Sequence, residues 1–180
     1  MTNVGLFIGR VQPLHFGHCQ LINYLIENCE VAIVGLGSVQ KKREKHNPFT
    51  QEERQQMIRN VYGDRVKIVP LVDLNATTPD QWCEYVIEKI KKVGLPEPNL
   101  YVSGSEADSY WYKDWFQAHG KTLVIHNRSQ NVWPAATEVR MFLELRTDGW
   151  KKWTPRVNHK LIQDKYPEEY KIPESEEIPF

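Results

Sequence analysis

The stretch VGLFIGRVQPLHFGH, which runs from Val4 to His18, decides the fold of this chain. It opens with an apolar run that predicts a short buried β-strand over residues 4–8, and a helical pattern begins at residue 17. Between the two lies a turn that ends with His15 and His18. A turn that leads from a strand into a helix directs backbone N–H groups at its occupant, and this arrangement suits a phosphate group.

The side chains of this turn match that ligand. His15 and His18 can each donate a ring N–H to an oxygen that gains charge, and Arg10 and Gln12 add further donors. Gly17 lets the backbone approach a ligand closely. The spacing alone leaves two other interpretations open, a pair of helix-start histidines or two ligands of a metal ion. The metal interpretation lacks support because the cysteines are scattered and form no C-x-x-C pair.

Strand and helix patterns alternate along the rest of the chain. Apolar runs predict strands over residues 31–36, 66–71, 100–102 and 122–125, and helical spacing predicts helices over 17–28, 51–60, about 82–94, 108–119 and 137–145. The expected fold class is therefore α/β, an open parallel sheet with helices on both faces. Ligands of such sheets sit outside the carboxyl ends of the strands, often where the strand order reverses. The turn after the first strand lies at such an end.

Length and composition describe one ordinary globular domain. With 180 residues the chain fits a single domain, which we assign to residues 1–165, followed by a surface tail over 166–180 that is rich in Glu and Pro. Lys plus Arg and Asp plus Glu balance at 23 each, so no overall field favours nucleic acid or an anionic membrane. No apolar run reaches the roughly 18 residues of a membrane span. Three cysteines without a framework spacing agree with a reducing, cytoplasmic location.

A polar segment connects the second strand to the next helix. Residues 37–50 show no periodicity, and they hold four basic residues that could steer an anion or form a solvated loop: Lys41, Lys42, Arg43 and Lys45. Thr50 and Glu53 form a capping-box pattern that predicts a helix start, with Arg54 in its first turn.

Two separated blocks carry a family resemblance. Residues 5–18 and the block Asn47-Pro48-Phe49-Thr50-x-x-Glu53-Arg54-x-x-Met57-Ile58 resemble the archaeal-type nicotinamide-nucleotide adenylyltransferases of the H-x-G-H nucleotidylyltransferase superfamily. The stretch 104–115 is similar to the adenylyltransferase half of bacterial two-domain proteins that carry a Nudix hydrolase, and this chain has no Nudix box. The resemblance covers about residues 4–145 and implies a single-domain Rossmann-like nucleotidylyltransferase fold.

The resemblance also implies a reaction. AMP would pass from ATP to the 5′-phosphate of nicotinamide mononucleotide (NMN), with magnesium, giving NAD and pyrophosphate. His15, His18 and Arg140 would be catalytic. The residues implied to bind ATP are Gly9, Arg10, Gln12, Gly17, Arg54, Gly104 and Thr137. ATP and NMN are thus the expected partners, with no nucleic acid and no membrane, and a homo-oligomer is compatible with the sequence.

A later family motif matches residues 135–140 in part. Thr137 is expected to cap a helix, and Arg140, one turn in, would face the β- and γ-phosphates. Ala135 replaces the serine that the family usually has two residues before the threonine, so one hydroxyl donor is missing. Without the other motifs, the favoured interpretation of Arg140 would be a solvated charge on a helix face.

The mononucleotide pocket rests on three residues. Trp82 fits the position of the tryptophan that stacks on the nicotinamide ring in the family, although a core tryptophan is the alternative. Gly37 and Ser38, after the second strand, resemble the turn that lines the pocket. Pro79 replaces the asparagine that reads the carboxamide, and Asp80 lies close enough to substitute for it. A carboxylate there would accept from the amide of NMN and repel the acid form of the mononucleotide. Helix packing is the main interpretation of Asp108, Tyr110, Trp111 and Trp115, and contact of Asp108 with the adenosine ribose is the alternative.

Two other function classes stay open. One is a related adenylyl- or cytidylyltransferase that acts on phosphopantetheine, FMN or an alcohol phosphate, and the block at residues 47–54 argues against it. The other is a non-catalytic nucleotide sensor, in which Ala135 marks a decayed site. The presence of His15, His18 and Arg140 argues for activity, because a pure binder would not need all three at the phosphates.

Overall fold

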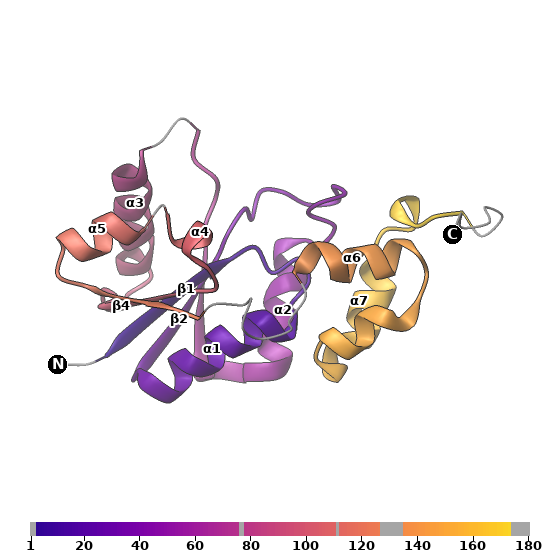
Figure 1. Ribbon diagram of the computed structural model, residues 1–180, viewed down its shortest axis with the longest axis horizontal. Helices are drawn as coiled ribbons and strands as arrows, with labels where there is room; N and C mark the ends of the chain where they lie inside the picture. The colour runs from indigo at the N-terminus through magenta and orange to yellow at the C-terminus, as the bar shows by residue number, and fades with distance from the viewer. Residues whose placement is uncertain (1–2, 76–77, 111, 127–134, 174–180) are drawn as a thin grey trace.

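A five-stranded parallel sheet forms the centre of the molecule, with the strand order β3-β2-β1-β4-β5 (Figure 1). The computed structural model describes residues 3–75, 78–110, 112–126 and 135–173. The strands are β1 (Val4–Gly9), β2 (Val31–Leu36), β3 (Val66–Pro70), β4 (Leu100–Ser103) and β5 (Thr122–Ile125). The α-helices are α1 (Phe16–Asn28), α2 (Gln51–Tyr62), α3 (Pro79–Lys92), α4 (Glu106–Ser109), α5 (Lys113–Ala118), α6 (Ala136–Glu144) and α7 (His159–Lys165). The predicted α/β class is confirmed.

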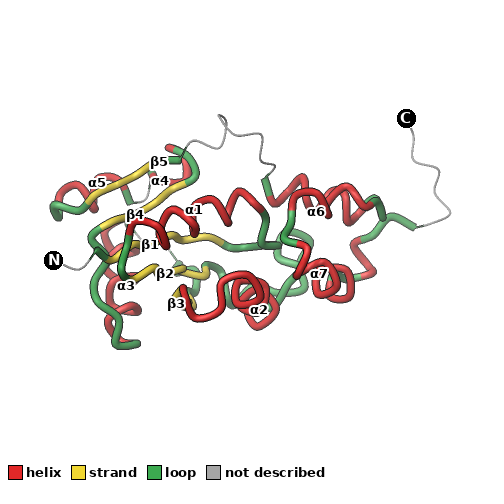
Figure 2. Tube along the Cα trace, turned by 90° about the horizontal axis from the view of Figure 1, so that it is seen from below, coloured by secondary structure: helices red, strands yellow, loops and turns green. Residues whose placement is uncertain are grey.

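Helices cover both faces of the sheet, because side chains of alternate residues along each strand point to opposite faces. Phe7 packs in one core cluster with residues of α1 and α2, such as Ile22 and Ile58. Its neighbour Leu6 packs in the other with residues of α3 and α5, such as Ile87 and Phe116. Figure 1 shows the two helical layers on either side of the strands, and Figure 2 shows the strands side by side.

The strand order reverses at β1. The chain runs outward from β1 through β2 to β3, then returns to the other side of β1 to form β4 and β5. The register places Gly9 beside Leu36 and Phe7 beside Val102, so the carboxyl ends of β1, β2 and β4 lie at one edge. This edge is the switch point at which such sheets bind ligands.

The capping box predicted at Thr50 is present. The Thr50 hydroxyl accepts from the N–H of Glu53 at 3.3 Å, and the Glu53 carboxylate accepts from the N–H of Thr50 at 2.9 Å. Both contacts satisfy donors that a helix start leaves unpaired. They fix α2 at the end of the polar segment that follows β2.

The single helix predicted over residues 108–119 is wrong, because the chain forms two short helices, α4 and α5, in this region. The Ser109 hydroxyl donates to the carbonyl of Glu106 at 2.7 Å, which competes with helix propagation. The Tyr112 N–H then donates three residues back, to the carbonyl of Ser109 at 2.9 Å. The Tyr112 ring turns into the core, where it is 9% exposed. We infer that burying this ring stabilises the chain more than continuing one regular helix through the region would.

The C-terminal segment extends the domain beyond the expected boundary at residue 165. Three short 3-10 helices, η3 (Asp148–Trp153), η4 (Arg156–Asn158) and η5 (Glu168–Tyr170), accompany α7 beside α2 and α6 (Figure 2). Tyr166 is 3% exposed in the core, and the Ile172 N–H donates to the carbonyl of Glu144 at 2.8 Å. Residues 166–173 of the predicted surface tail therefore contact the rest of the domain, and 174–180 lie outside the described part of the chain.

One further finding concerns membranes. Among the residues that the structure describes, no helix combines the length and the apolar character that crossing a bilayer requires.

Candidate active site

A cavity of about 380 Å³ opens at the switch point of the sheet. It lies at the edge where β1, β2 and β4 end, and the start of α6 also reaches it. The lining residues that the sequence predicted are Gly9, Arg10, Gln12, His15, His18, Ser38, Trp82, Gly104, Thr137 and Arg140. Gly17, Arg54 and Asp80 are not among the lining residues. The tertiary structure thus brings most of the predicted residues together.

The two histidines line the cavity as a close, tilted pair, with ring centroids 3.7 Å apart and an interplanar angle of 32°. His15 is the N-cap of α1, and its Nδ1 accepts from the N–H of Gly17 at 3.1 Å. The Nδ1 of His18 accepts from the N–H of His15 at 3.4 Å. Because each δ nitrogen is an acceptor, the neutral rings carry their hydrogen on Nε2. Each imidazole is therefore set as a donor through Nε2, while the Gly17 amide is used inside the cap.

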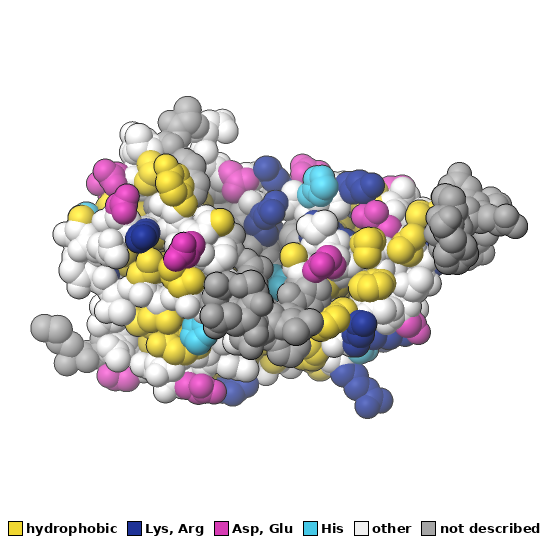
Figure 3. All heavy atoms as spheres, in the orientation of Figure 1, with side chains coloured by type: hydrophobic (Ala, Val, Ile, Leu, Met, Phe, Trp, Pro, Cys, Tyr) yellow, Lys and Arg dark blue, Asp and Glu magenta, His cyan; other side chains and the backbone are white. Residues whose placement is uncertain are grey.

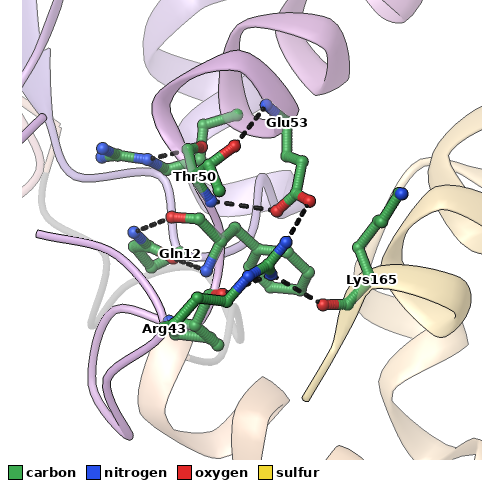
Figure 4. Close-up of polar contacts among 8 residues, drawn as sticks. Gln12, Arg43, Thr50, Glu53 and Lys165 are labelled. Atoms are coloured by element: carbon green, nitrogen blue, oxygen red, sulfur yellow. Dashed lines mark hydrogen bonds and ion pairs between the residues drawn. The ribbon is translucent and has the colours of Figure 1, made fainter.

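Gln12 connects the first block of the family resemblance to the second. Its side-chain Nε2 donates to the carbonyl of Phe49 at 3.0 Å, and its Oε1 accepts from the N–H of Phe49 at 2.9 Å (Figure 4). Gln12 is 2% exposed. These two backbone hydrogen bonds position the turn. Only one amide hydrogen is used in them, so donation by Gln12 to a phosphate in the cavity stays a prediction.

Arg54, like Gln12, is a buried side chain that binds backbone groups of other segments. It is fully buried, with 0% exposure, and it donates to the carbonyls of Arg10 at 2.7 Å and Gly37 at 2.8 Å. A further contact reaches the carbonyl of Ser38 at 3.3 Å. Burial lowers the pKa of the guanidinium to about 10. These contacts do not favour the role of phosphate ligand that the resemblance implied, because the guanidinium faces carbonyls inside the protein.

The carbonyls held by Arg54 precede two strained residues. Val11 and Ser38 both line the cavity and have φ values of 53° and 52°, in the left-handed region that side chains other than glycine rarely adopt. Such a conformation costs about 1–3 kcal/mol per residue. Arg54 therefore holds the turn after β1 and the turn after β2 in the shape that forms the cavity wall.

Arg140 reaches the cavity from α6. It is 6% exposed, and it donates to the carbonyl of Gln12 at 2.8 Å and to the hydroxyl of Thr137 at 3.2 Å. Burial, and next the positive charge of Arg10, lower the pKa of the Arg140 guanidinium. Arg10 itself is exposed and lines the same cavity. Two guanidinium groups that repel each other across one cavity favour an anionic ligand between them.

Thr137 does not cap α6 as predicted. The helix begins at Ala136, and Ala135 is the N-cap. Ala135 has no side-chain acceptor for the helix start, although its N–H donates to the Glu138 carboxylate at 2.7 Å and its carbonyl accepts from the N–H of Glu138 at 3.0 Å. Thr137 lies within the first turn, where its hydroxyl meets Arg140 and lines the cavity. The serine-to-alanine departure from the family motif thus removes the side-chain cap.

Asp73 is a site residue that the sequence did not indicate. It lines the cavity, accepts from the Ser38 hydroxyl at 2.8 Å and pairs with Lys41 at 3.3 Å. Asp80, which the sequence favoured, is exposed outside the lining. Asp73 lies three residues after the end of β3, so the rule that ligands meet the carboxyl ends of strands could have indicated it.

Acidic partners hold much of the basic segment after β2. Lys41 pairs with Asp73, Arg43 with Glu53 at 2.5 Å, and Lys45 with Glu144 at 3.7 Å. All four basic residues are exposed, as the interpretation of a solvated loop predicts, and the steering of an anion stays a prediction. Arg43 also donates to the carbonyl of Lys165 at 2.9 Å (Figure 4). On the face shown in Figure 3, basic and acidic side chains are interspersed, which agrees with a formal net charge of zero.

The aromatic residues near the cavity differ in their roles. Tyr112 lines the cavity together with Trp82, which is half-buried there. Trp115 is 7% exposed and packs in the core, as the interpretation of helix packing predicted. Tyr110 is 73% exposed. The side chain of Asp108 and all of Trp111 lie outside the described residues.

The residues present do not form a metal site of their own. Within the described parts of the chain, no group of three or more His, Cys, Asp or Glu residues is placed to hold a metal ion. Asp73, the one carboxylate among the described lining residues, is already engaged by Ser38 and Lys41.

A cavity at the switch point of a parallel sheet, with imidazole donors at a helix start, is the arrangement of nucleotide-binding α/β proteins. The chain belongs to the cytidylyltransferase-like family, whose profile matches residues 6–163.

Relatives agree with this assignment. The nicotinamide-nucleotide adenylyltransferase of Thermococcus kodakarensis is 25% identical over 170 residues, which cover 91% of this chain and 84% of that protein. The enzyme of the same name from Pyrococcus horikoshii is 26% identical over 165 residues, which cover 89% and 82%. These relatives confirm the resemblance that the two sequence blocks indicate.

A solved structure shares the fold. A bifunctional NMN adenylyltransferase/ADP-ribose pyrophosphatase from Francisella tularensis, solved with AMP and a manganese ion, superposes with a TM-score of 0.70 at 24% identity. The match covers 94% of this chain and 51% of that one, so this chain spans about half the length of the bifunctional protein.

Proposed function

We propose that this protein transfers AMP from ATP to NMN, forming NAD and pyrophosphate. One observation carries the proposal: His15, His18 and Arg140 line the same switch-point cavity as Trp82 and Asp73. The first three are cationic or donating groups suited to phosphates, and the last two suit a planar ring with polar substituents. The names of the archaeal relatives support the same reaction.

The reaction needs no nucleophilic side chain. An anionic oxygen of the acceptor phosphate attacks the α-phosphorus of ATP, a new P–O bond forms, and the bond to the bridging oxygen of pyrophosphate breaks. The protein has to align the two phosphates and neutralise the charge that moves onto the leaving group. We assign the Nε2–H donors of His15 and His18, with Arg140, to the triphosphate oxygens.

Magnesium would come with the nucleotide. The described residues do not fit a protein-held metal site. A hard divalent cation of this kind binds phosphate oxygens and water well. Mg²⁺ is therefore assigned to the Mg–ATP substrate. The alignment of the phosphates and the neutralisation of charge described above are assigned to the side chains. A cytoplasmic location fits these substrates and stays a prediction.

An acceptor panel tests the proposal. Purified protein is incubated with ATP, magnesium and one phosphorylated acceptor at a time: NMN, nicotinic acid mononucleotide, FMN, phosphopantetheine or glycerol phosphate. We expect pyrophosphate release with NMN, together with NAD formation. Release with another acceptor alone would replace NMN by that acceptor, whereas ATP binding without pyrophosphate from any acceptor would identify a nucleotide sensor.

A further inference from the structure

Two aromatic residues of the cavity are joined by a hydrogen bond. The indole N–H of Trp82 donates to the hydroxyl oxygen of Tyr112 at 2.9 Å. Trp82 lies in the first turn of α3, and Tyr112 precedes α5, so the bond connects two elements 30 residues apart in the sequence. Both side chains line the cavity. The bond therefore fixes one edge of the indole at the cavity wall.

Tyr112 is itself anchored. Its ring packs against Tyr101, with centroids 4.6 Å apart, and Tyr101 is 1% exposed in the core. Tyr112 is 9% exposed, so its hydroxyl is presented from a ring that has little room to move. Tyr112 can thus act as a fixed point for a neighbouring side chain.

Trp82 is supported on a second side by Tyr85. The two ring centroids lie 5.4 Å apart with an interplanar angle of 35°. The Tyr85 hydroxyl accepts from the N–H of Val72 at 3.0 Å, next to Asp73. Residues 79–81, which share the first turn of α3 with Trp82, are exposed. Packing by the rest of this turn therefore does little to orient the indole. The indole packs against the core cluster that includes Tyr112, and the contacts of Tyr112 and Tyr85 add a hydrogen bond and a ring contact.

We infer that Tyr112 is a positioning residue that holds the Trp82 indole as a binding face for the pyridinium ring of the acceptor mononucleotide. The inference rests on the proposed function. The ring nitrogen of NMN is quaternary, so the ring is a planar cation. Cations bind best to the face of tryptophan among the aromatic side chains. An indole that donates its N–H to an oxygen is also polarised toward greater electron density on its ring.

The test variant is Tyr112→Phe, which removes the hydroxyl and keeps the ring. We expect the KM for NMN to rise about fivefold, the loss of one ordinary hydrogen bond, while kcat and the KM for ATP stay within about twofold. Quenching of tryptophan fluorescence by NMN should weaken in parallel, because a tilted indole overlaps the pyridinium less. Tyr110→Phe is the matched control, since Tyr110 is 73% exposed and outside the lining.

A double-mutant cycle separates positioning from packing. Trp82→Phe keeps a ring but lacks the indole donor, so adding Tyr112→Phe to it should cost no further NMN affinity if Tyr112 acts through Trp82. Additive losses, or an unchanged KM for NMN in Tyr112→Phe, would overturn the inference. If the wild-type protein releases no pyrophosphate with NMN, the proposed function fails instead. NMN titration by fluorescence then decides the positioning role, which an unaltered dissociation constant in Tyr112→Phe would refute.

Discussion

The side-chain amide of Gln12 pairs with the backbone of Phe49 in both directions, as donor to its carbonyl and acceptor from its N–H. Because Phe49 is also fully buried, this pair fixes the turn after β1 against the segment before α2. The carbonyl of Gln12 then accepts from Arg140. One residue thus sets the relative position of the two sequence blocks and of the arginine on α6.

Gln12→Met should destabilise the protein. The thioether keeps the length of the side chain and leaves the Phe49 N–H and carbonyl buried without a strong partner, which costs about 2–4 kcal/mol. Chemical denaturation gives the free energy of unfolding, with Gln117→Met, at an exposed glutamine, as control. If Gln12 were instead a phosphate donor, the variant would keep wild-type stability and lose ATP affinity.

His18→Ala should remove most turnover and leave the fold intact. Loss of one preorganised donor to the phosphates costs ~3 kcal/mol in the barrier, about two orders of magnitude in kcat. The rate of pyrophosphate release from ATP and NMN measures this loss, and circular dichroism checks the fold. Unchanged turnover in a folded variant would remove His18 from the mechanism.

Arg54→Lys should lower stability more than it changes chemistry. An ammonium group keeps the charge but cannot reach the carbonyls of Arg10, Gly37 and Ser38 at once, so we expect a loss of about 2–3 kcal/mol in the free energy of unfolding. Arg59→Lys, at a half-exposed arginine of the same helix, is the control. A variant of unchanged stability whose KM for ATP rises more than about tenfold would restore the ligand role.

Asp73→Asn should weaken the preference for the amide mononucleotide. A carboxylate beside the ring repels the carboxylate of nicotinic acid mononucleotide, and an asparagine does not. Since the Asp73 side chain is 38% exposed and paired with Lys41, we expect a change of only about fivefold in the ratio of the two kcat/KM values. Asp80→Asn, outside the cavity lining, should leave the ratio unaltered, and the reverse pattern would return the role to Asp80.

Glu97 gives the protein a part of its acid sensitivity. Hydrogen bonds from Lys121 and then Lys91 lower the pKa of its carboxyl below the ordinary value of 4.5. At a pH between the lowered value and 4.5, the folded state therefore binds fewer protons at Glu97 than the unfolded state does. The contribution of Glu97 to the free energy of unfolding is complete above pH 4.5 and is lost as the pH falls through the lowered pKa. We expect about 0.5 kcal/mol, because the carboxyl is well exposed.

Unfolding of Glu97→Gln and wild type, compared at pH 6 and pH 3, checks this expectation. The difference in the free energy of unfolding should shrink at the lower pH. Glu88→Gln, at an exposed glutamate of α3, should show no such trend. A difference that grows on acidification contradicts the predicted sign.

Interactions between residues close in the sequence predict much of the secondary structure and the histidine turn of this protein. Apolar runs and helical spacing predict the parallel sheet, because a buried strand or a buried helix face requires apolar residues at a regular spacing within a short stretch of sequence. The Thr50 and Glu53 cap and the turn with His15 and His18 are visible for the same reason.

Tertiary structure decided which polar side chains face the cavity. Gln12 and Arg54 look like phosphate donors in the sequence, yet their partners, the backbone groups of Phe49, Arg10 and Gly37, come from other segments. Asp73 and Tyr112 line the cavity, whereas Asp80 is not among its lining residues. A hydrogen-bond donor has a fixed chemistry but no fixed partner, and only the packing of distant segments supplies the partner.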